Sequence, residues 1–396
     1  MRISLITHSY RPETGAAPNR LYEMCKGLKR NGVDISVVTG MPNYPTGHIF
    51  PGYQGKWRMT EEMDGIQVRR HWMYASNSKK ILPRIWSMFS LAITLFGSQH
   101  YLRKRRNDFI IVQTPQLMIA FTAWLMAWAT HTPLILNVSD LWPLTAKEMG
   151  AIRGDSPLYK AAERLERFLY THSALCVGQS QQIVDYMGTH GAKQVYLFRN
   201  GVDPSRFLPN TADDNSEPLK LIYTGLIGYA QGLVEIAKHI DFAALGAELH
   251  IYGAGGEEHD LQDYLSEHPD KGIFFHGKVE RDAVPALLAE CHATLIPLRQ
   301  SIYGAVPSKI YESMAAGLPI LFSGNGEGAD IVEQNQVGLV SSASDYDALA
   351  EHVRYLAQHR EQLTFYRTHC LTCANQKFNR TKQTDELYEH LLTMIQ

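Results

Sequence analysis

The sequence predicts an α/β protein with two Rossmann-like, doubly wound domains that face a cleft. Short apolar runs alternate with stretches of helical periodicity along most of the chain, and a polar segment interrupts this alternation once. A chain of 396 residues is also too long for one ordinary core and suits two domains of roughly 200 residues each.

The first half of the chain carries the signature of a parallel sheet. After the first apolar run, Leu21, Met24, Cys25 and Leu28 recur at helical spacing, so a helix follows the first strand. Continuous apolar strands separated by helices are typical of a parallel sheet covered on both faces. The predicted strands are 2–7, 33–39, 108–113, 133–138, 174–178 and 194–198.

A polar segment at 210–218, NTADDNSEP, contains a proline and no periodicity, and we interpret it as a linker. The alternation then restarts, with predicted strands at 219–225, 247–253, 272–277, 293–298 and 318–323 and a helical segment from about 345 onward. The predicted units are an N-terminal domain at 1–210, a C-terminal domain at 211–375, and a last helix at 376–396 that packs back on the N-terminal domain.

Composition favours a soluble, globular, cytosolic protein. Apolar residues make up 45% of the chain, charged residues 20%, and the net charge is −2, which gives no electrostatic support to a nucleic-acid partner. The opening MRISLITHSY does not resemble a signal peptide. The five cysteines are scattered, and the pair Cys370 and Cys373 lacks the second pair that a zinc site needs, so no metal is expected.

One apolar stretch leaves two interpretations open. The segment 84–106 has an apolar centre of about a dozen residues, too short to span a bilayer, with a basic cluster behind it and Lys79, Lys80 and Arg84 at its start. It suits either an interfacial helix on anionic lipid or a helix buried against the sheet. The similarly apolar 118–129 favours the buried helix.

The loop at 8–20 connects the first strand to the first helix. It has no G-x-G-x-x-G, so a dinucleotide fingerprint is absent. Gly15 and Ala16 are small enough to let a ligand approach the backbone, although the motif taken alone slightly favours an ordinary tight loop. His8 ends the strand, and a plain loop residue is the alternative for it.

A second turn stands in the equivalent place of the second domain. In YTGLIGYAQGL, Gly225, Gly228 and Gly232 open a turn whose backbone suits a phosphate. This turn contains no lysine or arginine, so a bound diphosphate must take its positive charge from elsewhere or from a metal. Further turns at predicted strand ends contain Asn200, Gly253, Gly255 and Val279, and the carboxyl ends of parallel strands are where such sheets bind ligands.

The segment 306–320, VPSKIYESMAAGLPI, carries the strongest local signal. Pro307 and Ser308 suit a helix start, which puts Lys309 and Glu312 on one helix face. Alone they suggest a surface ion pair. Beside the glycine turns, Lys309 becomes a phosphate ligand and Glu312 an acceptor for two vicinal hydroxyls, as on a ribose.

Asp140 ends a strand of the first domain. It can hold an acceptor hydroxyl or act as a base, and a turn or helix cap is the alternative role.

These segments resemble the retaining glycosyltransferases of family 4, which have the GT-B fold, over essentially the whole chain. The resemblance rests on RPETGAAPNRLYEMCKGLKRNGVDISVVTG, RNGVD and YESMAAGLPI, the last of which matches the signature E-A-M-A-x-G-x-P. Within the family, the chain resembles a subgroup that adds N-acetylfucosamine or related deoxy-amino sugars in O-antigen and capsule assembly. The segments that carry this resemblance are TGMPNYPTGHIFPGY, SDLWP, LERFLY, YAQGL and PSKIYE.

The resemblance implies a UDP-linked sugar donor, a polyprenyl-diphosphate-linked saccharide as acceptor, and a place at the cytoplasmic face of the membrane. It also implies retention of configuration without a metal or other cofactor, and no Asp-x-Asp stands at a predicted strand end. Implied donor-binding residues are Gly15, Ala16, Gly225, Gly228, Gln231, Gly253, Gly255, Val279, Ser308, Lys309 and Glu312. Implied acceptor-binding residues are His8, Arg20, Asp140 and Asn200, and the implied catalytic residues are Lys309, Glu312 and Asp140.

Two departures from the family pattern stand out. The first glutamate of the family's E-x7-E falls on Gly304, and the basic residues of its second glycine turn fall on Leu226 and Gln231. Lys309 must therefore stabilise the diphosphate, helped by Ser308 and the Gly15 loop. The alternatives are a UDP-sugar epimerase on the same fold and a non-catalytic relative.

Overall fold

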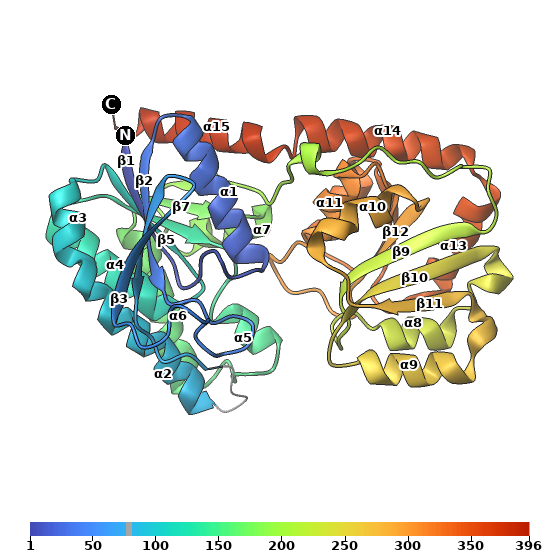
Figure 1. Cartoon of the computed structure of the whole chain (residues 1–396), viewed down its shortest axis with the longest axis horizontal. Coiled ribbons are helices and arrows are strands. Elements are labelled where there is room, and N and C mark those ends of the chain that lie inside the picture. The colour runs from blue at the N-terminus through green and yellow to red at the C-terminus, as the bar shows by residue number, and fades with distance from the viewer. Residues whose placement is uncertain (77–80, 396) are drawn as a thin grey trace. The chain divides into compact units, whose positions relative to one another are not determined.

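The computed structural model describes residues 1–76 and 81–395 and divides the chain into two compact units. The first unit joins Met1–Arg199 to Arg380–Gln396, and the second is Asn200–Asn379. Each unit contains one sheet with helices on both of its faces (Figure 1).

The first unit is built on an eight-stranded sheet of order β3-β4-β2-β1-β5-β6-β7-β8. All pairs are parallel except β3 with β4. The strands are β1 (Arg2–Ile6), β2 (Asp34–Gly40), β3 (Arg58–Met63), β4 (Ile66–His71), β5 (Phe109–Gln113), β6 (Leu134–Val138), β7 (Leu175–Gly178) and β8 (Val195–Leu197). The helices are α1 (Ala16–Arg30), α2 (Ile81–Thr94), the short 3-10 helix η1 (Leu95–Ser98), α3 (Gln99–Arg105), α4 (Leu117–Thr130), α5 (Leu144–Glu148), α6 (Pro157–His172), α7 (Gln181–Thr189) and α15 (Arg380–Thr393).

The second unit has a parallel six-stranded sheet of order β11-β10-β9-β12-β13-β14. The strands are β9 (Leu219–Leu226), β10 (Ala247–Ala254), β11 (Ile273–Gly277), β12 (Ala293–Pro297), β13 (Ile320–Ser323) and β14 (Gly338–Ser341). The helices are α8 (Leu233–His239), α9 (Glu258–Glu267), α10 (Val284–Ala289), α11 (Lys309–Ala315), α12 (Glu327–Gln334), α13 (Tyr346–Gln358) and α14 (Glu361–Gln376).

Each sheet has one point where the strand order reverses direction. It lies between β1 and β5 in the first unit and between β9 and β12 in the second. Ligands of open α/β sheets bind outside the carboxyl ends of the strands at that point.

Three strands were not predicted. β3 and β4 alternate polar and apolar residues instead of forming a continuous apolar run, and β14 has only four residues. β3 and β14 are edge strands, which pack on fewer neighbours than central ones and need less apolar character, and β4 lies next to β3 at the same side of its sheet.

The predicted domain boundary was misplaced. The chain passes into the second unit at Asn200, so the segment 210–218 is not a link between domains. Within the second unit it is fastened to α14, because Arg367 donates two hydrogen bonds of 2.7 Å to the carboxylate of Asp214. An ion pair between partners far apart in sequence leaves no signal in local periodicity.

The last helix packs on α1 within the first unit (Figure 1). A Cβ added to Gly27 would lie 2.5 Å from Cγ2 of Thr384, so the two helices touch where α1 lacks a side chain. Ion pairs join Arg380 to Glu23 at 3.6 Å and Arg30 to Asp385.

The two apolar helical segments take different environments. Helix α4 is buried on the sheet through Ile119, Ala120, Ala123 and Met126, as predicted for 118–129. Helix α2 exposes large apolar side chains, although Lys79 and Lys80 lie outside the described residues. Among the described residues, no helix is long and apolar enough to cross a membrane.

Candidate functional site

In the second unit, the glycine turn follows β9 at the point where the strand order reverses. Gly225 adopts a φ of +141°, which side chains other than hydrogen rarely allow. A Cβ at this position would lie 2.5 Å from Nζ of Lys309. The backbone conformation therefore favours glycine here, and the lysine side chain extends over the turn.

The ammonium group of Lys309 lies beside this turn. Its Nζ donates a hydrogen bond of 3.2 Å to the hydroxyl of Tyr223 and lies 4.4 Å from the centroid of the tyrosine ring. Burial lowers the pKa of Lys309 to about 8, while the charge of Glu312 raises it. A partly desolvated ammonium gains from a bound anion, which would restore its preference for the charged form.

Tyr223 was missed by the sequence reasoning. It lies inside the apolar strand β9, and its hydroxyl donates to the carbonyl oxygen of Leu226. The only available signal was a polar tip within an otherwise apolar run.

The predicted pair on the helix is placed as expected. Lys309 and Glu312 both belong to α11, with Ser308 exposed at its N-cap. The Glu312 side chain is partly exposed, so it can receive a ligand from solvent.

Gly253 and Gly255, two other glycines of the predicted site, allow two backbone segments to approach each other closely. A Cβ on Gly253 would lie 1.8 Å from the carbonyl oxygen of Gly225, and one on Gly255 would lie 2.0 Å from that of Ile227. Both glycines thus allow β10 and its following loop to pack against the turn. Close packing alone accounts for them.

Gly228 and Gln231 differ from these glycines. Only side-chain atoms of Gln231 and Leu226 lie near a Cβ added to Gly228. The nearest atom to a Cβ on Gly228 would be Oε1 of Gln231, at 3.5 Å. That Oε1 is buried and accepts no hydrogen bond within the described part of the chain. A buried acceptor without a donor is unfavourable, and a ligand hydroxyl or amide would satisfy it. Val279, also predicted, lies partly buried just after β11.

In the first unit, a buried polar network occupies the carboxyl ends of β5, β6 and β7. The guanidinium of Arg20 donates to Oε1 of Gln179 and, over 3.1 Å, to Oε1 of Gln113. Gln113 also accepts a hydrogen bond of 2.8 Å from Asn137. Gln113, which ends β5, and Gln179, which follows β7, were not predicted.

Arg20 is buried and electrostatically coupled to Asp140. Burial and the charge of Arg380 lower the pKa of Arg20 to about 10, and Asp140 raises it. Burial raises the pKa of Asp140, and Arg20 lowers it. The two groups therefore influence each other's charge at the edge where ligands of such sheets bind.

The remaining predicted residues form no hydrogen bond with these two clusters that the described part of the chain shows. His8 is partly buried, and burial lowers its pKa to about 4, which keeps the imidazole neutral. Gly15 and Ala16 lie at the start of α1 in the first unit, whereas the other predicted donor ligands lie in the second. Asn200 was assigned to the first domain, but it begins the second unit.

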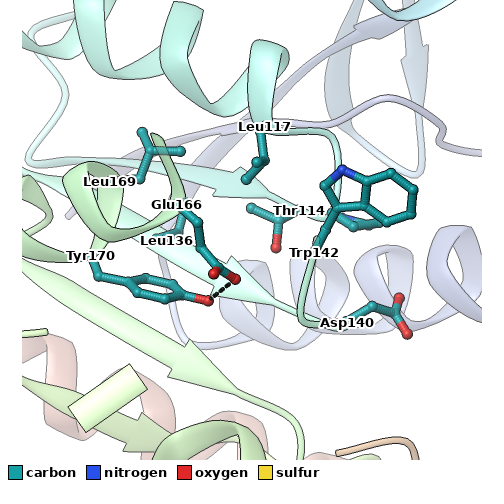
Figure 2. Close-up of a pocket in the computed structure, with 9 residues that line it drawn as sticks. Thr114, Leu117, Leu136, Asp140, Trp142, Glu166, Leu169 and Tyr170 are labelled. Carbon is teal, nitrogen blue, oxygen red and sulfur yellow. Dashed lines mark hydrogen bonds between the residues drawn. The ribbon is translucent and has the colours of Figure 1, made fainter. Parts of the chain in front are cut away.

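A small pocket lies beside this network, with room for about one water molecule. Figure 2 shows Glu166 pointing into it, while the carboxylate of Asp140 is turned away from Glu166. Glu166 is 2% exposed and accepts hydrogen bonds from Tyr170 (2.7 Å) and Tyr186 (3.3 Å). Burial raises the pKa of Glu166 to about 7. Sequence reasoning did not single out this carboxylate, although its spacing from Leu169 and Tyr170 places it on the buried face of α6.

Metal ligands are not gathered at either cluster. Among the described residues, no group of three or more His, Cys, Asp or Glu side chains is arranged to hold a metal ion. All five cysteines are buried and free.

Comparisons with known proteins assign each unit to a known domain type. Residues 15–201 match the family described as Glycosyl transferase 4-like domain, and residues 220–359 match Glycosyl transferases group 1.

Individual proteins similar to this chain are also glycosyltransferases by name. The chain is 25% identical over 338 residues to the putative colanic acid biosynthesis glycosyl transferase WcaI of Escherichia coli, covering 80% of this chain and 82% of WcaI. It is 24% identical to the probable glycosyltransferase WbjE of Pseudomonas aeruginosa over 289 residues, which is 69% of this chain and 72% of WbjE. The crystal structure of Anabaena HepE in complex with UDP superposes with a TM-score of 0.72 at 15% identity, covering 99% of this chain and 100% of HepE.

Proposed function

This chain is a glycosyltransferase with the GT-B fold, and from that premise we propose that it transfers a sugar from a UDP-sugar to a polyprenyl-diphosphate-linked saccharide, with retention of the anomeric configuration. The observation that carries the proposal is the position of Lys309 over Gly225, which places a cation where a nucleotide diphosphate would lie at the end of β9.

The second unit is assigned the donor. Lys309 stabilises the negative charge that grows on the leaving diphosphate, a contribution that is usually large in group transfer. Glu312 accepts hydrogen bonds from the two ribose hydroxyls, because a carboxylate has two oxygens to offer. The complex of Anabaena HepE with UDP supports a uridine nucleotide. No metal ion is required in this scheme.

The first unit is assigned the acceptor. Asp140, held near the buried cation of Arg20, orients the attacking hydroxyl or receives its proton. His8, neutral at physiological pH, accepts or donates a hydrogen bond nearby. The leaving diphosphate assists deprotonation from the side of the departing group.

Surface polysaccharide assembly is the proposed setting, with a deoxy-amino sugar such as N-acetylfucosamine as the transferred group. The names of WcaI and WbjE support a role in building such polymers at a coarse level. The residue at Gly304, where the family's first glutamate is replaced, leaves sugar recognition to other groups.

Helix α2 supports an association with the membrane surface. Trp86, Phe89, Ile93 and Phe96, spaced along one face of α2 and η1, are 52%, 38%, 59% and 45% exposed. The opposite face buries Leu91 and Leu95 in the core, beside Ser87, Ser90 and Ala92. A surface helix of a globular protein usually carries polar residues on its exposed face, whereas these four exposed positions are apolar.

Charge favours lipid over a second copy of the chain as the partner of this face. The stretch 66–107 contains nine lysines and arginines and no acidic residue. Of these, Arg103, Lys104 and Arg106 are exposed at the end of α3. Anionic headgroups attract such a cluster, whereas a symmetric contact would set like charges against each other.

The proposal is tested by reconstituting the reaction. Purified protein is first screened for stabilisation by UDP-sugars, then given the stabilising donor and a polyprenyl-diphosphate-linked saccharide in vesicles with EDTA present. We expect a lengthened lipid-linked saccharide with the donor's anomeric configuration, read by mass spectrometry and NMR.

A lysine variant and its control complete the test. Lys309→Ala is expected to abolish transfer while the circular dichroism spectrum is unchanged, and Lys377→Ala, an exposed lysine of α14's end, is expected to keep full activity. Full activity in Lys309→Ala overturns the assignment of Lys309. Isomerisation of the donor without an acceptor would show an epimerase, and UDP binding without turnover would show a non-catalytic relative.

A further inference from the structure

The donor turn of the second unit lacks a basic residue of its own, although a nucleoside diphosphate carries two or more negative charges. Between Gly225 and Gly232 the chain contains no lysine or arginine. Lys309 supplies one cation, and its pKa of about 8 leaves that cation only weakly favoured before an anion binds. A second source of positive charge would strengthen the site.

Arg299 stands at the right place in the fold. Strand β12 lies next to β9 in the sheet, and Arg299 follows its last residue, Pro297, by two positions. The residue is thus at the carboxyl edge, on the other side of the point where the strand order reverses. Such a point is where sheets of this kind bind nucleotides.

The backbone of Arg299 is fixed against the donor turn. Its amide donates a hydrogen bond of 2.8 Å to the carbonyl oxygen of Ala230. A Cβ added to Gly232 would lie 3.6 Å from Cβ of Arg299, in ordinary contact. Gly232 has a φ of +64°, so its backbone conformation also favours glycine.

The guanidinium of Arg299 reaches over the same turn. Its Cζ lies 4.2 Å from the ring centroid of Tyr229, which is 65% exposed. A cation over a ring at this distance is held by the ring's negative face. The side chain is therefore directed along the turn.

The charge of Arg299 is not consumed by a carboxylate. Within the described part of the chain, it forms no ion pair. Arg299 contributes to lowering the pKa of Glu235, but the hydrogen bond from Lys238 is the largest cause. The Lys238–Glu235 pair is closed at 3.0 Å.

We infer that Arg299 is a second cationic ligand of the donor's diphosphate, which takes the place of the basic residues that the turn lacks. The inference rests on the proposed function, because it assigns a ligand group to the same donor site. A guanidinium suits the task, since its planar donors bind two phosphate oxygens at once. The stacking on Tyr229 holds it in place before the ligand arrives.

The test compares three ligands that differ in phosphate number. Titration calorimetry with UDP, UMP and uridine is carried out on the wild-type chain, Arg299→Gln, Arg299→Lys and, as a matched control, Arg354→Gln on α13. Arg299→Gln is expected to weaken UDP binding by about tenfold or more, to weaken UMP binding less, and to leave uridine binding unchanged. Arg299→Lys is expected to bind UDP more tightly than Arg299→Gln but less tightly than the wild type. Arg354→Gln is expected to bind UDP as the wild type does.

Each result decides between explanations. Unchanged UDP affinity in Arg299→Gln overturns the inference while leaving the proposed donor intact. Equal weakening for UDP and uridine also overturns it, because the substitution would then have altered the turn itself. Failure of the wild-type chain to bind UDP would overturn both the donor assignment and this inference.

Discussion

The ammonium of Lys309 lies 3.2 Å from the hydroxyl of Tyr223 and 4.4 Å from the centre of its ring. A residue from the first turn of a helix and a residue from a strand thus meet above Gly225, which is too small to obstruct them. The relationship fixes a cation at the carboxyl edge of the second sheet. It also gives the cation a burial that changes how it titrates.

Binding of UDP by the wild-type chain is expected to weaken as the pH rises through about 8. Burial lowers the pKa of Lys309 to about 8, so above that pH the free protein has lost the proton that the diphosphate attracts. Calorimetry between pH 6.5 and 9.5 measures this. In Lys309→Ala the affinity should be lower and should change little over the same range. A pH slope that survives in Lys309→Ala contradicts the assignment.

The acceptor role of Asp140 separates from donor binding. Asp140→Asn keeps the shape of the side chain but removes its charge, so transfer is expected to fall at least about tenfold. The affinity for UDP should be unchanged, because Asp140 lies in the first unit and the donor ligands lie in the second. Turnover and UDP titration are measured on the same preparation. Loss of UDP affinity together with turnover would argue for a structural role instead.

The exposed face of α2 is expected to bind anionic vesicles. Trp86→Ser with Phe89→Ser removes two exposed aromatic groups and should reduce binding to vesicles containing phosphatidylglycerol by about tenfold or more. Phe365→Ser, an exposed aromatic residue of α14, is the control and should bind as the wild type does. Raising the salt concentration should weaken the electrostatic share of the binding. Equal binding by the double variant and the wild type would show that the face has another partner.

Glu166 should make the first unit less stable as pH rises. Its folded pKa is about 7, above its ordinary value, so the folded state holds a proton that the unfolded state has released between roughly pH 4.5 and 7. Stability is therefore full below that range and is lost as the pH rises through it.

A variant isolates this effect. Glu166→Gln cannot titrate, so its stability should be nearly flat across the range and greater than that of the wild type above pH 7, by up to about 3 kcal/mol. Tryptophan fluorescence reports the right unit, since all six tryptophans lie within the first unit. Glu389→Gln, an exposed carboxylate of α15, should keep the wild-type pH profile.

Much of the fold followed from local pattern. Eleven predicted strands lie on observed strands, and the pair Lys309 and Glu312 lies on one helix because the spacing of three residues belongs to one helix face. Strands β3, β4 and β14 were missed, because β3 and β4 mix polar with apolar residues and β14 has only Leu339 and Val340 between a glycine and a serine.

Much of the candidate site could not be predicted from local sequence pattern. Arg299 becomes a neighbour of the donor turn only when β12 lies beside β9, although it follows Gly232 by 67 residues in the chain. Gln113 and Gln179 meet Arg20 for the same reason. The sequence of a short segment does not indicate which strand ends become neighbours in the folded sheet.

The sequence by itself determined the alternation of strands and helices, the presence of two such series, and the helix that carries Lys309 and Glu312, because these depend on contacts a few residues apart. Only the tertiary structure decided where the chain passes between units, which face of α2 meets solvent, and which side chains gather beside Gly225. Burial and long-range packing set those features, and both depend on segments distant in sequence.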